Sequence, residues 1–226
     1  MNTELTTKSP TVEQRAAIHA ALADPARLRI IDTLSLGDAS PSELAASLHM
    51  ASNLIAHHLN VLEAEGLIER RRSEGDRRRT YLQIRRSPFD DLALPTTHAK
   101  RVLFVCTANS ARSHLAVALW RRASPIPAAS AGTKPAERID PGALAAAARH
   151  NLPLRRLRPR PISDVHQDGD LVITVCDLAH EDLRGLVRLH WSIADPVPVG
   201  TQAAFDQTVT QLDRRVTDLA PHLIAS

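Results

Sequence analysis

Residues 101–113 read RVLFVCTANSARS, and this segment indicates the fold class of the second half of the chain. Residues 101–105 form a short apolar run of the kind that makes a buried strand. A helical pattern follows Ser113, so Cys106 is expected in the turn between a strand and a helix. Helical and strand-like segments then alternate toward the C-terminus. This alternation predicts an α/β fold with a parallel sheet.

The spacing of Cys106 and Arg112 suits the binding of a tetrahedral oxyanion. The five residues between them allow a loop to curl so that its backbone N–H groups point at one anion, and the next helix adds positive potential that favours a thiolate. Arg112 can hold two oxygens at once, and Ser113 can donate a hydrogen bond to the thiolate. The alternative is a structural cysteine at the end of a strand. The expected oxyanion-binding residues are Thr107, Ala108, Asn109, Ser110, Ala111, Arg112 and Ser113.

The first half of the chain is typical of three helices. The first helix carries Leu28, Ile31 and Leu34 at helical spacing, and Gly37 ends it. Residues 40–43, Ser-Pro-Ser-Glu, then provide an N-cap serine, a proline at the first helical position and a glutamate three residues after the cap. These residues predict the start of a second helix.

The second and third helices are expected over residues 42–49 and from about Ser52 to Gly66. Two short helices joined by a tight turn predict a helix-turn-helix, whose second helix enters the major groove of DNA. The residues expected to face the core are Leu44, Leu48, Ile55, Leu59 and Leu62.

A hairpin is expected next, because residues 67–72 and 77–84 are β-prone and flank the turn Ser73-Glu74-Gly75-Asp76. Residues 70–86 hold eight arginines against Glu74 and Asp76, whereas the formal net charge of the whole chain is only +3. Guanidinium groups neutralise phosphates and enter minor grooves. The alternative is a solvated surface hairpin. The arginines expected to contact DNA are Arg71, Arg72, Arg77, Arg78 and Arg79.

Residues 87–99 contain two prolines and no periodicity, which predicts a linker. The expected organisation is a mainly α winged helix-turn-helix domain over residues 1–86 and an α/β domain over residues 100–226. With 43% hydrophobic residues, the chain can bury a core. No run approaches the roughly 18 apolar residues of a membrane helix, and the N-terminus lacks a secretory pattern. We therefore expect a cytoplasmic protein without a membrane partner.

The cysteines and histidines give no sign of a metal site or of a disulfide scaffold. Cys106 and Cys176 are the only cysteines among 226 residues, and the 11 histidines show no ligand spacing. In a reducing cytoplasm, two such cysteines are expected to be buried, catalytic or redox-active. We predict no bound metal.

Residues 21–30, 57–62 and 65–68 read ALADPARLRI, HHLNVL and EGLI, and they resemble the winged helix-turn-helix of ArsR-type repressors. The resemblance covers residues 12–85 and implies a homodimer that reads a pseudo-palindromic operator in double-stranded DNA. Many such repressors sense arsenite or a metal through cysteines on the helix before the recognition helix, but residues 42–49 contain none. Any inducer must bind elsewhere, or the repressor works without that switch.

The resemblance also gives the residues of the recognition helix their roles. Five residues of the third helix lie on the side opposite its core-facing residues and are expected to face the DNA groove. His58 is instead expected to be a packed or capping histidine. The groove-facing set is Ser52, Asn53, Ala56, His57 and Asn60.

Five segments resemble the low-molecular-weight tyrosine phosphatases, and more closely the arsenate reductases that share their fold. The segments are residues 105–113, 129–133, 139–141, 170–177 and 190–196. The resemblance implies that Cys106 is the nucleophile and that Arg112 clamps the oxyanion. Asp195, before Pro196, is the implied general acid.

Two features favour the reductase within this resemblance. The sequence WSIADP at residues 191–196 is similar to the acid loop of the reductases, whereas tyrosine phosphatases usually have an aromatic residue after Asp-Pro. Cys176 matches the position of a redox cysteine in thioredoxin-coupled reductases, although a buried apolar role for it stays open. The third cysteine that the reductases commonly carry is missing, because residues 177–189 contain none. Ala108 and Ala111 also replace a common glycine and a common cysteine.

The leading hypothesis is a transcriptional regulator fused to an arsenate reductase. Cys106 would form a thiol–arsenate adduct, which either Cys176 or a small external thiol then attacks. The reaction needs no bound cofactor, but it needs thioredoxin or a low-molecular-weight thiol as reductant. Two alternatives remain: a regulator whose phosphatase-like domain only senses arsenic or an oxyanion, and a protein-tyrosine phosphatase tethered to DNA.

Overall fold

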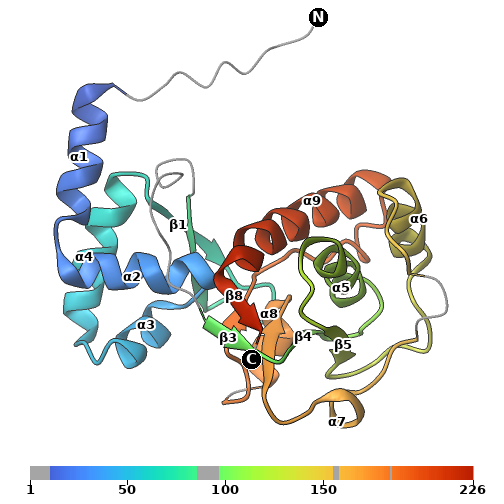
Figure 1. Ribbon diagram of the computed structural model, residues 1–226. Coiled ribbons are helices and arrows are strands. Elements are labelled where there is room, and N and C mark those ends of the chain that lie inside the picture. Colours follow the sequence, from blue (N-terminus) through green and yellow to red (C-terminus); the bar gives the residue numbers. More distant parts are fainter. Residues whose placement is uncertain (1–10, 86–96, 155–157, 184, 226) are drawn as a thin grey trace, which may run out of the picture.

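The computed structural model describes residues 11–85, 97–154, 158–183 and 185–225. A helical N-terminal part with a β-hairpin lies beside a C-terminal part in which helices surround a parallel sheet (Figure 1). Each part has its own hydrophobic core. This arrangement confirms the predicted fold class.

The N-terminal domain consists of four helices and one hairpin. The helices are α1 (Val12–Leu22), α2 (Pro25–Leu36), α3 (Pro41–Ser47) and α4 (Ser52–Ala64). Strands β1 (Ile68–Arg72) and β2 (Thr80–Ile84) pair antiparallel, with Ile68 opposite Ile84. Ser40 and Glu43 form the capping box that starts α3, as the sequence predicts. Helix α1 precedes the three predicted helices and is capped by Thr11.

The buried face of α2 differs from the predicted pattern at one position. Ile31 and Leu34 are buried, but Leu28 is 42% exposed and Ile30 is fully buried instead. At 100° per residue, Ile30, Ile31 and Leu34 lie on one face, and Leu28 lies about a third of a turn away from its centre.

The C-terminal domain is built on a four-stranded parallel sheet in the order β5-β4-β6-β7. Its strands are β4 (Arg101–Cys106), β5 (Ala128–Gly132), β6 (Asp170–Thr174) and β7 (Leu189–His190). The helices are α5 (Arg112–Ala123), α6 (Pro141–Arg149), α7 (Ile162–Val165), α8 (Asp177–Asp182) and α9 (Gln202–Leu219), followed by η1 (Ala220–His222). Since β4 and β6 are parallel neighbours, the segments that follow them meet at the same edge of the sheet.

The end of the predicted linker is a strand. Residues 97–99 form β3 (Thr97–Ala99), which pairs parallel with β8 (Leu223–Ala225). The sequence gives no sign of this strand, because its partner lies at the other end of the domain. The rest of the linker, residues 87–96, lies outside the described residues.

Asp38, which follows α2, joins the two domains. Its side chain is fully buried, and its two oxygens bind groups from both domains. Oδ1 accepts from Nη2 of Arg215 at 2.5 Å, and Oδ2 accepts from the backbone N–H of Ser192 at 2.7 Å and from Nε2 of Gln83 at 2.8 Å. Among the residues that the structure describes, no helix is both long and apolar enough to cross a membrane.

Candidate active site

The loop after β4 forms a cradle around Cys106. Asn109 adopts φ = 47°, a left-handed conformation that asparagine tolerates better than most residues. Its Nδ2 donates to Oγ of Ser113 at 2.8 Å, and its Oδ1 accepts from the backbone N–H of Arg160 at 2.8 Å. Oγ of Ser113 lies 3.1 Å from Sγ of Cys106. Because this hydroxyl already accepts from Asn109, its own proton is available for the sulfur.

Gly132, at the end of β5, allows the loop to come close to the sheet. A Cβ atom at this position would lie 2.7 Å from the carbonyl oxygen of Thr107 and 2.9 Å from Cβ of Asn109. Both distances are shorter than normal contacts, so only glycine fits here without a shift of the loop. The sequence gives no sign of this role of Gly132, although the residue lies within one of the segments that carry the resemblance.

Arg112, the first residue of α5, connects the cradle to the loop that carries Asp195. Its Nη2 donates to Oδ2 of Asp195 at 2.6 Å, and its Nη1 donates to the carbonyl oxygen of Ile193 at 2.9 Å. Burial alone would lower the pKa of Arg112, but nearby groups raise it above its usual value. In order of decreasing effect, these groups are Cys176, Cys106, Asp195 and Glu74.

Cys176 lies beside the same cradle, immediately before α8. Its Sγ is 3.4 Å from Oγ1 of Thr107, and both cysteines are free and 2% exposed. Burial raises the pKa of Cys176, and Arg112 partly opposes this effect. A second thiol that responds to both Arg112 and Cys106 is therefore part of the site.

The predicted catalytic residues therefore gather in one place from three separate segments. Arg112 contacts Asp195, Cys106 contacts Ser113, and Cys176 contacts Thr107. Among the described residues, no group of three or more His, Cys, Asp or Glu side chains could hold a metal ion.

The predicted groove-facing residues of α4 are all exposed, and His58 is 7% exposed. Nδ1 of His58 lies 3.9 Å from Oδ1 of Asp24, which caps α2. His58 is thus a packed histidine, as the sequence predicts. DNA contact by the exposed set stays a prediction.

The arginines of the hairpin divide into two groups. Arg72, Arg77 and Arg78 are exposed, although Nε of Arg78 also donates to Oδ1 of the neighbouring Asp76 at 3.0 Å. Arg71 instead donates to the carbonyl oxygen of Ser192 at 3.0 Å, and Arg79 lies 3.5 Å from Glu43. Those two arginines are engaged within the chain in this structure, and their predicted contact with DNA is not tested by it.

The turn of the hairpin, residues 73–76, lies against the C-terminal domain, which could not be expected from the sequence. Glu74 and Glu181 take part in this contact, each through its carboxylate. The contacting residues are more than 100 positions apart in the sequence. The only hint is that Glu74 and Asp76 interrupt the run of arginines.

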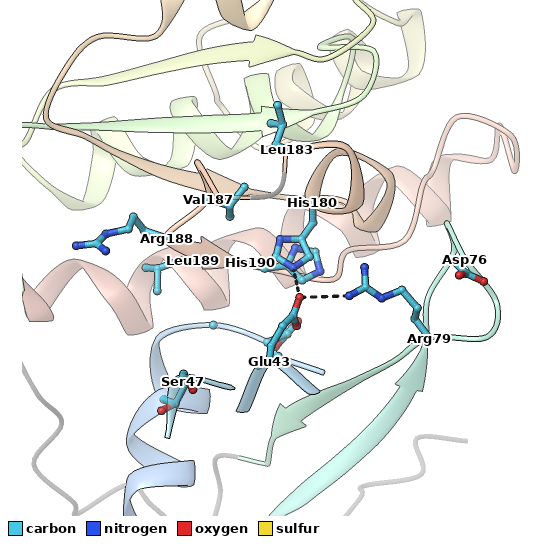
Figure 2. Close-up of a pocket in the computed structure, with 15 residues that line it drawn as sticks. Glu43, Ser47, Asp76, Arg79, His180, Leu183, Val187, Arg188, Leu189 and His190 are labelled. Carbon is cyan, nitrogen blue, oxygen red and sulfur yellow. Dashed lines mark hydrogen bonds and ion pairs between the residues drawn. The ribbon is translucent and has the colours of Figure 1, made fainter. Parts of the chain in front are cut away.

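A separate cavity of about 720 Å³ lies between the domains, and none of the predicted catalytic residues lines it (Figure 2). His180 and His190 stack there with ring centroids 4.1 Å apart, and Nε2 of His180 lies 3.0 Å from Glu43 (Figure 2). Burial would raise the pKa of Glu43, but hydrogen bonds from His180 and Ser40 outweigh it and lower that pKa to about 2. Glu43 is therefore ionised at neutral pH and ties α3 to α8.

The family described as "Low molecular weight phosphotyrosine protein phosphatase" matches residues 101–226, which is more than half of the chain. The chain belongs to this family. A second family, described as "Bacterial regulatory protein, arsR family", matches residues 24–70. The chain thus joins an ArsR-type helix-turn-helix to a domain of the low molecular weight phosphatase family.

Individual relatives agree with this division. A transcriptional repressor SmtB homolog from Synechocystis sp. (strain ATCC 27184 / PCC 6803 / Kazusa) is 33% identical over 60 residues, which are 26% of this chain. The match spans 46% of that repressor, so the chain covers about half the length of this curated relative.

Solved structures similar to the phosphatase-family domain carry different activities in their names. An arsenate reductase from Archaeoglobus fulgidus DSM 4304 is 30% identical and covers 53% of this chain and 98% of its own, with a TM-score of 0.47. The tyrosine phosphatase Wzb from Escherichia coli K30, in complex with sulphate, is 24% identical and covers 54% and 97%, with a TM-score of 0.50.

Proposed function

We propose that this chain is an ArsR-type DNA-binding regulator fused to a thiol-dependent arsenate reductase. One observation carries the choice of reductase over phosphatase: Cys176, a second free thiol, is buried beside the cradle of Cys106. Hydrolysis of a phosphate ester needs one nucleophile and an acid. Reduction of arsenate needs two electrons, which a pair of thiols can supply.

In the first step, the thiolate of Cys106 attacks the arsenic of arsenate. A sulfur–arsenic bond forms, an arsenic–oxygen bond breaks, and Asp195 supplies the proton with which the oxygen leaves as water. Arg112 and the N–H groups of the loop hold the remaining oxygens and neutralise their charge. Arsenic stays in the +5 state during this step.

In the second step, the sulfur of Cys176 attacks the sulfur of Cys106, and the proton of the Cys176 thiol passes to an oxygen of the departing arsenic group. The sulfur–arsenic bond breaks, and its electron pair stays on arsenic, which leaves as arsenite in the +3 state. The two thiols are oxidised to one disulfide. Thioredoxin or a low-molecular-weight thiol then reduces this disulfide, so no bound cofactor is needed.

The experiment is an arsenate turnover assay of the full chain, with thioredoxin and with low-molecular-weight thiols in parallel. We expect arsenite from the wild type, none from Cys106→Ser, and none from Cys176→Ser with thioredoxin alone. Full turnover of Cys176→Ser with thioredoxin would exclude the internal disulfide. If the wild type forms no arsenite with any thiol, the proposed reductase activity is ruled out. Rapid aryl-phosphate hydrolysis by the same protein would then favour phosphatase activity.

A second candidate function is supported by the contact between the hairpin and the site. Glu74 lies close enough to Arg112 to raise its pKa, so the DNA-binding domain contributes a charge to the cradle. Occupancy of the cradle by an oxyanion would then change DNA affinity, and by linkage DNA would change oxyanion affinity by the same factor. DNA binding that does not respond to arsenate, arsenite or phosphate would count against this sensor.

A further inference from the structure

We infer that the turn of the hairpin, residues 73–76, is a lid that admits small inorganic oxyanions to the cradle and excludes phosphorylated proteins. We call these four residues the wing tip. The inference rests on the proposed oxyanion site and narrows the class of its substrate. It also gives the DNA-binding domain a direct role in the selectivity of the other domain.

The wing tip is fixed to α8, the helix that follows Cys176. Oγ of Ser73 donates to Oε1 of Glu181 at 2.6 Å, and the backbone N–H of Asp76 donates to Oε2 of the same carboxylate at 3.0 Å. The N–H of Glu74 donates to Oδ2 of Asp177 at 2.7 Å. Both acceptors are carboxylate side chains, and hydrogen bonds to charged groups are stronger than neutral ones.

The wing tip approaches α8 closely at Gly75. A Cβ atom on Gly75 would lie 2.4 Å from Oε2 of Glu181 and 3.2 Å from Cδ2 of Leu178. The turn and the helix are therefore in van der Waals contact, without a solvent layer between them.

The wing tip also contacts the loop that carries the implied general acid. The backbone N–H of Asp195 donates to Oε2 of Glu74 at 3.1 Å. Next to the tip, Arg71 donates to the carbonyl oxygen of Ser192 and lies 3.7 Å from Glu74. The hairpin thus bridges the acid loop and α8, which flank the cradle on two sides.

Selection by size follows from this bridge. The phosphate of a phosphorylated protein is attached to the backbone through a side chain. The protein itself must therefore come close to Asp195 and α8 before its phosphate can reach the cradle. An inorganic oxyanion is not attached to a protein and needs only a narrow path to the cradle. The inner face of the cradle is already enclosed, since Ser110 is 8% exposed and Arg112 is 5% exposed.

Selection by charge follows from Glu74. Its carboxylate adds negative charge near Arg112, and this charge opposes any dianion that enters the cradle. Removal of that charge should strengthen the binding of oxyanions that are small enough to reach the cradle. Release of the tip from α8 should instead strengthen the binding of large ligands alone.

The test uses the full chain with Cys106→Ser, which binds without turnover, as the parent protein. Two probes are titrated: inorganic phosphate by calorimetry, and a labelled phosphotyrosine peptide by fluorescence anisotropy. Glu181→Ala is added to release the wing tip. Asp182→Ala is the matched control, because it removes an acid from the same helix whose partner is Lys134, at 3.4 Å.

We expect the parent and the Asp182→Ala protein to bind phosphate but not the peptide. Glu181→Ala should bind the peptide at least about tenfold more tightly, in competition with phosphate, while its phosphate affinity stays within about threefold. Glu74→Ala, the second variant, should strengthen the binding of phosphate but not of the peptide, because it removes a charge near Arg112 and leaves the contacts with Glu181 in place.

If the peptide binds the parent protein as tightly as it binds the Glu181→Ala protein, the lid is overturned. The lid is equally overturned if Glu181→Ala gains no peptide affinity while phosphate binds all four proteins. A failure of the proposed oxyanion site gives a different result, because phosphate would then bind none of the four proteins. In that case the proposal of a lid is overturned as well.

Discussion

The hydroxyl of Ser113 has one proton, and the residues around it decide where that proton points. Nδ2 of Asn109 occupies the acceptor side of the hydroxyl, and the sulfur of Cys106 lies within reach of its proton. The left-handed backbone of Asn109 holds this amide in place, with Arg160 on its other end. The cradle thus depends on a few backbone and side-chain positions that tolerate little change.

Substitution of Gly132 by alanine tests this dependence. The added methyl group would press on the carbonyl of Thr107 and on Asn109, and overpacking of this kind costs roughly 1–3 kcal/mol. We expect Gly132→Ala to lower the free energy of unfolding by that amount and to weaken phosphate binding at least about tenfold. Urea unfolding and calorimetric titration measure the two effects. Unchanged phosphate affinity would contradict the proposed geometry.

His114, in the first turn of α5, makes stability depend on pH. Burial lowers its pKa to about 4, although the backbone of Asn109 partly opposes this, and Nδ1 lies 3.1 Å from Oγ of Ser130. Between pH 6.5 and 4 the unfolded chain therefore binds a proton that the folded chain does not, so stability falls as pH falls. From pH 7 to pH 5 we expect His114 to cost about 2 kcal/mol.

The measurement is urea unfolding of the wild type and His114→Gln at pH 7 and pH 5. The variant should lose less stability than the wild type over this interval. Glu43 does not interfere, because the contribution of a carboxyl whose pKa is lowered to about 2 is lost only below its unfolded value of 4.5. Equal losses in both proteins would show that His114 does not titrate as described.

Helix α4 and the hairpin are both predicted to contact DNA, each through its own set of residues. Helix α4 exposes its groove-facing set, whereas the hairpin exposes only part of its arginines. Charge contacts to phosphate and contacts to bases respond differently to salt. The two elements can therefore be told apart by salt titration.

Replacement of the exposed arginines by alanine tests the hairpin. Loss of each phosphate contact should reduce the slope of log K against log salt by about 0.9. The residues replaced together are Arg72, Arg77 and Arg78. Binding to a duplex of generic sequence, measured by anisotropy over a range of salt, gives the slope. Asn60→Ala is the matched control and should leave this slope unchanged, since it lies in the groove-facing set.

Elements with strong local signals could be predicted from the sequence. The capping box at Ser40 and Glu43 starts α3, and the segment from β4 through Arg112 gives the strand, the loop and the helix of the site. The register of α2 could not be predicted at Leu28, because an apolar residue at helical spacing does not show which face meets the core. β3 could not be predicted either, since its strand partner is distant in sequence.

The residues of the site could be predicted better than its surroundings. Cys106, Arg112 and Asp195 follow from a spacing and a resemblance, and the structure brings them together. The contact of Glu74 with the acid loop depends on how two domains dock. No local pattern in the sequence encodes that docking.

The whole molecule is held together by buried charge as well as by apolar contact. Asp38 binds Arg215 of α9 across the domain boundary, and Glu43 binds His180 in a second contact. Trp191 adds a third, since its Nε1 donates to the carbonyl oxygen of Leu36 at 3.2 Å. We therefore expect the two domains to unfold together.

Asp38→Ala should separate them. It leaves the partly buried guanidinium of Arg215 without this carboxylate, and removal of one partner of a buried ion pair costs about 3–5 kcal/mol. Calorimetry should show one thermal transition for the wild type and two for Asp38→Ala. Asp32→Ala, at an exposed position of α2, is the control and should unfold like the wild type. A single transition for Asp38→Ala at an unchanged temperature would contradict this account of the interface.

The pairing of Cys106 with Cys176 on one oxyanion cradle is tested most directly by a single turnover. The reduced full chain is mixed with arsenate without any external thiol. The arsenite released and the free thiols that remain are then quantified, and mass spectrometry identifies any disulfide. We predict one arsenite released per chain, two thiols lost, and a disulfide that joins Cys106 to Cys176. Arsenate that remains unreduced while both thiols stay free would contradict the proposal.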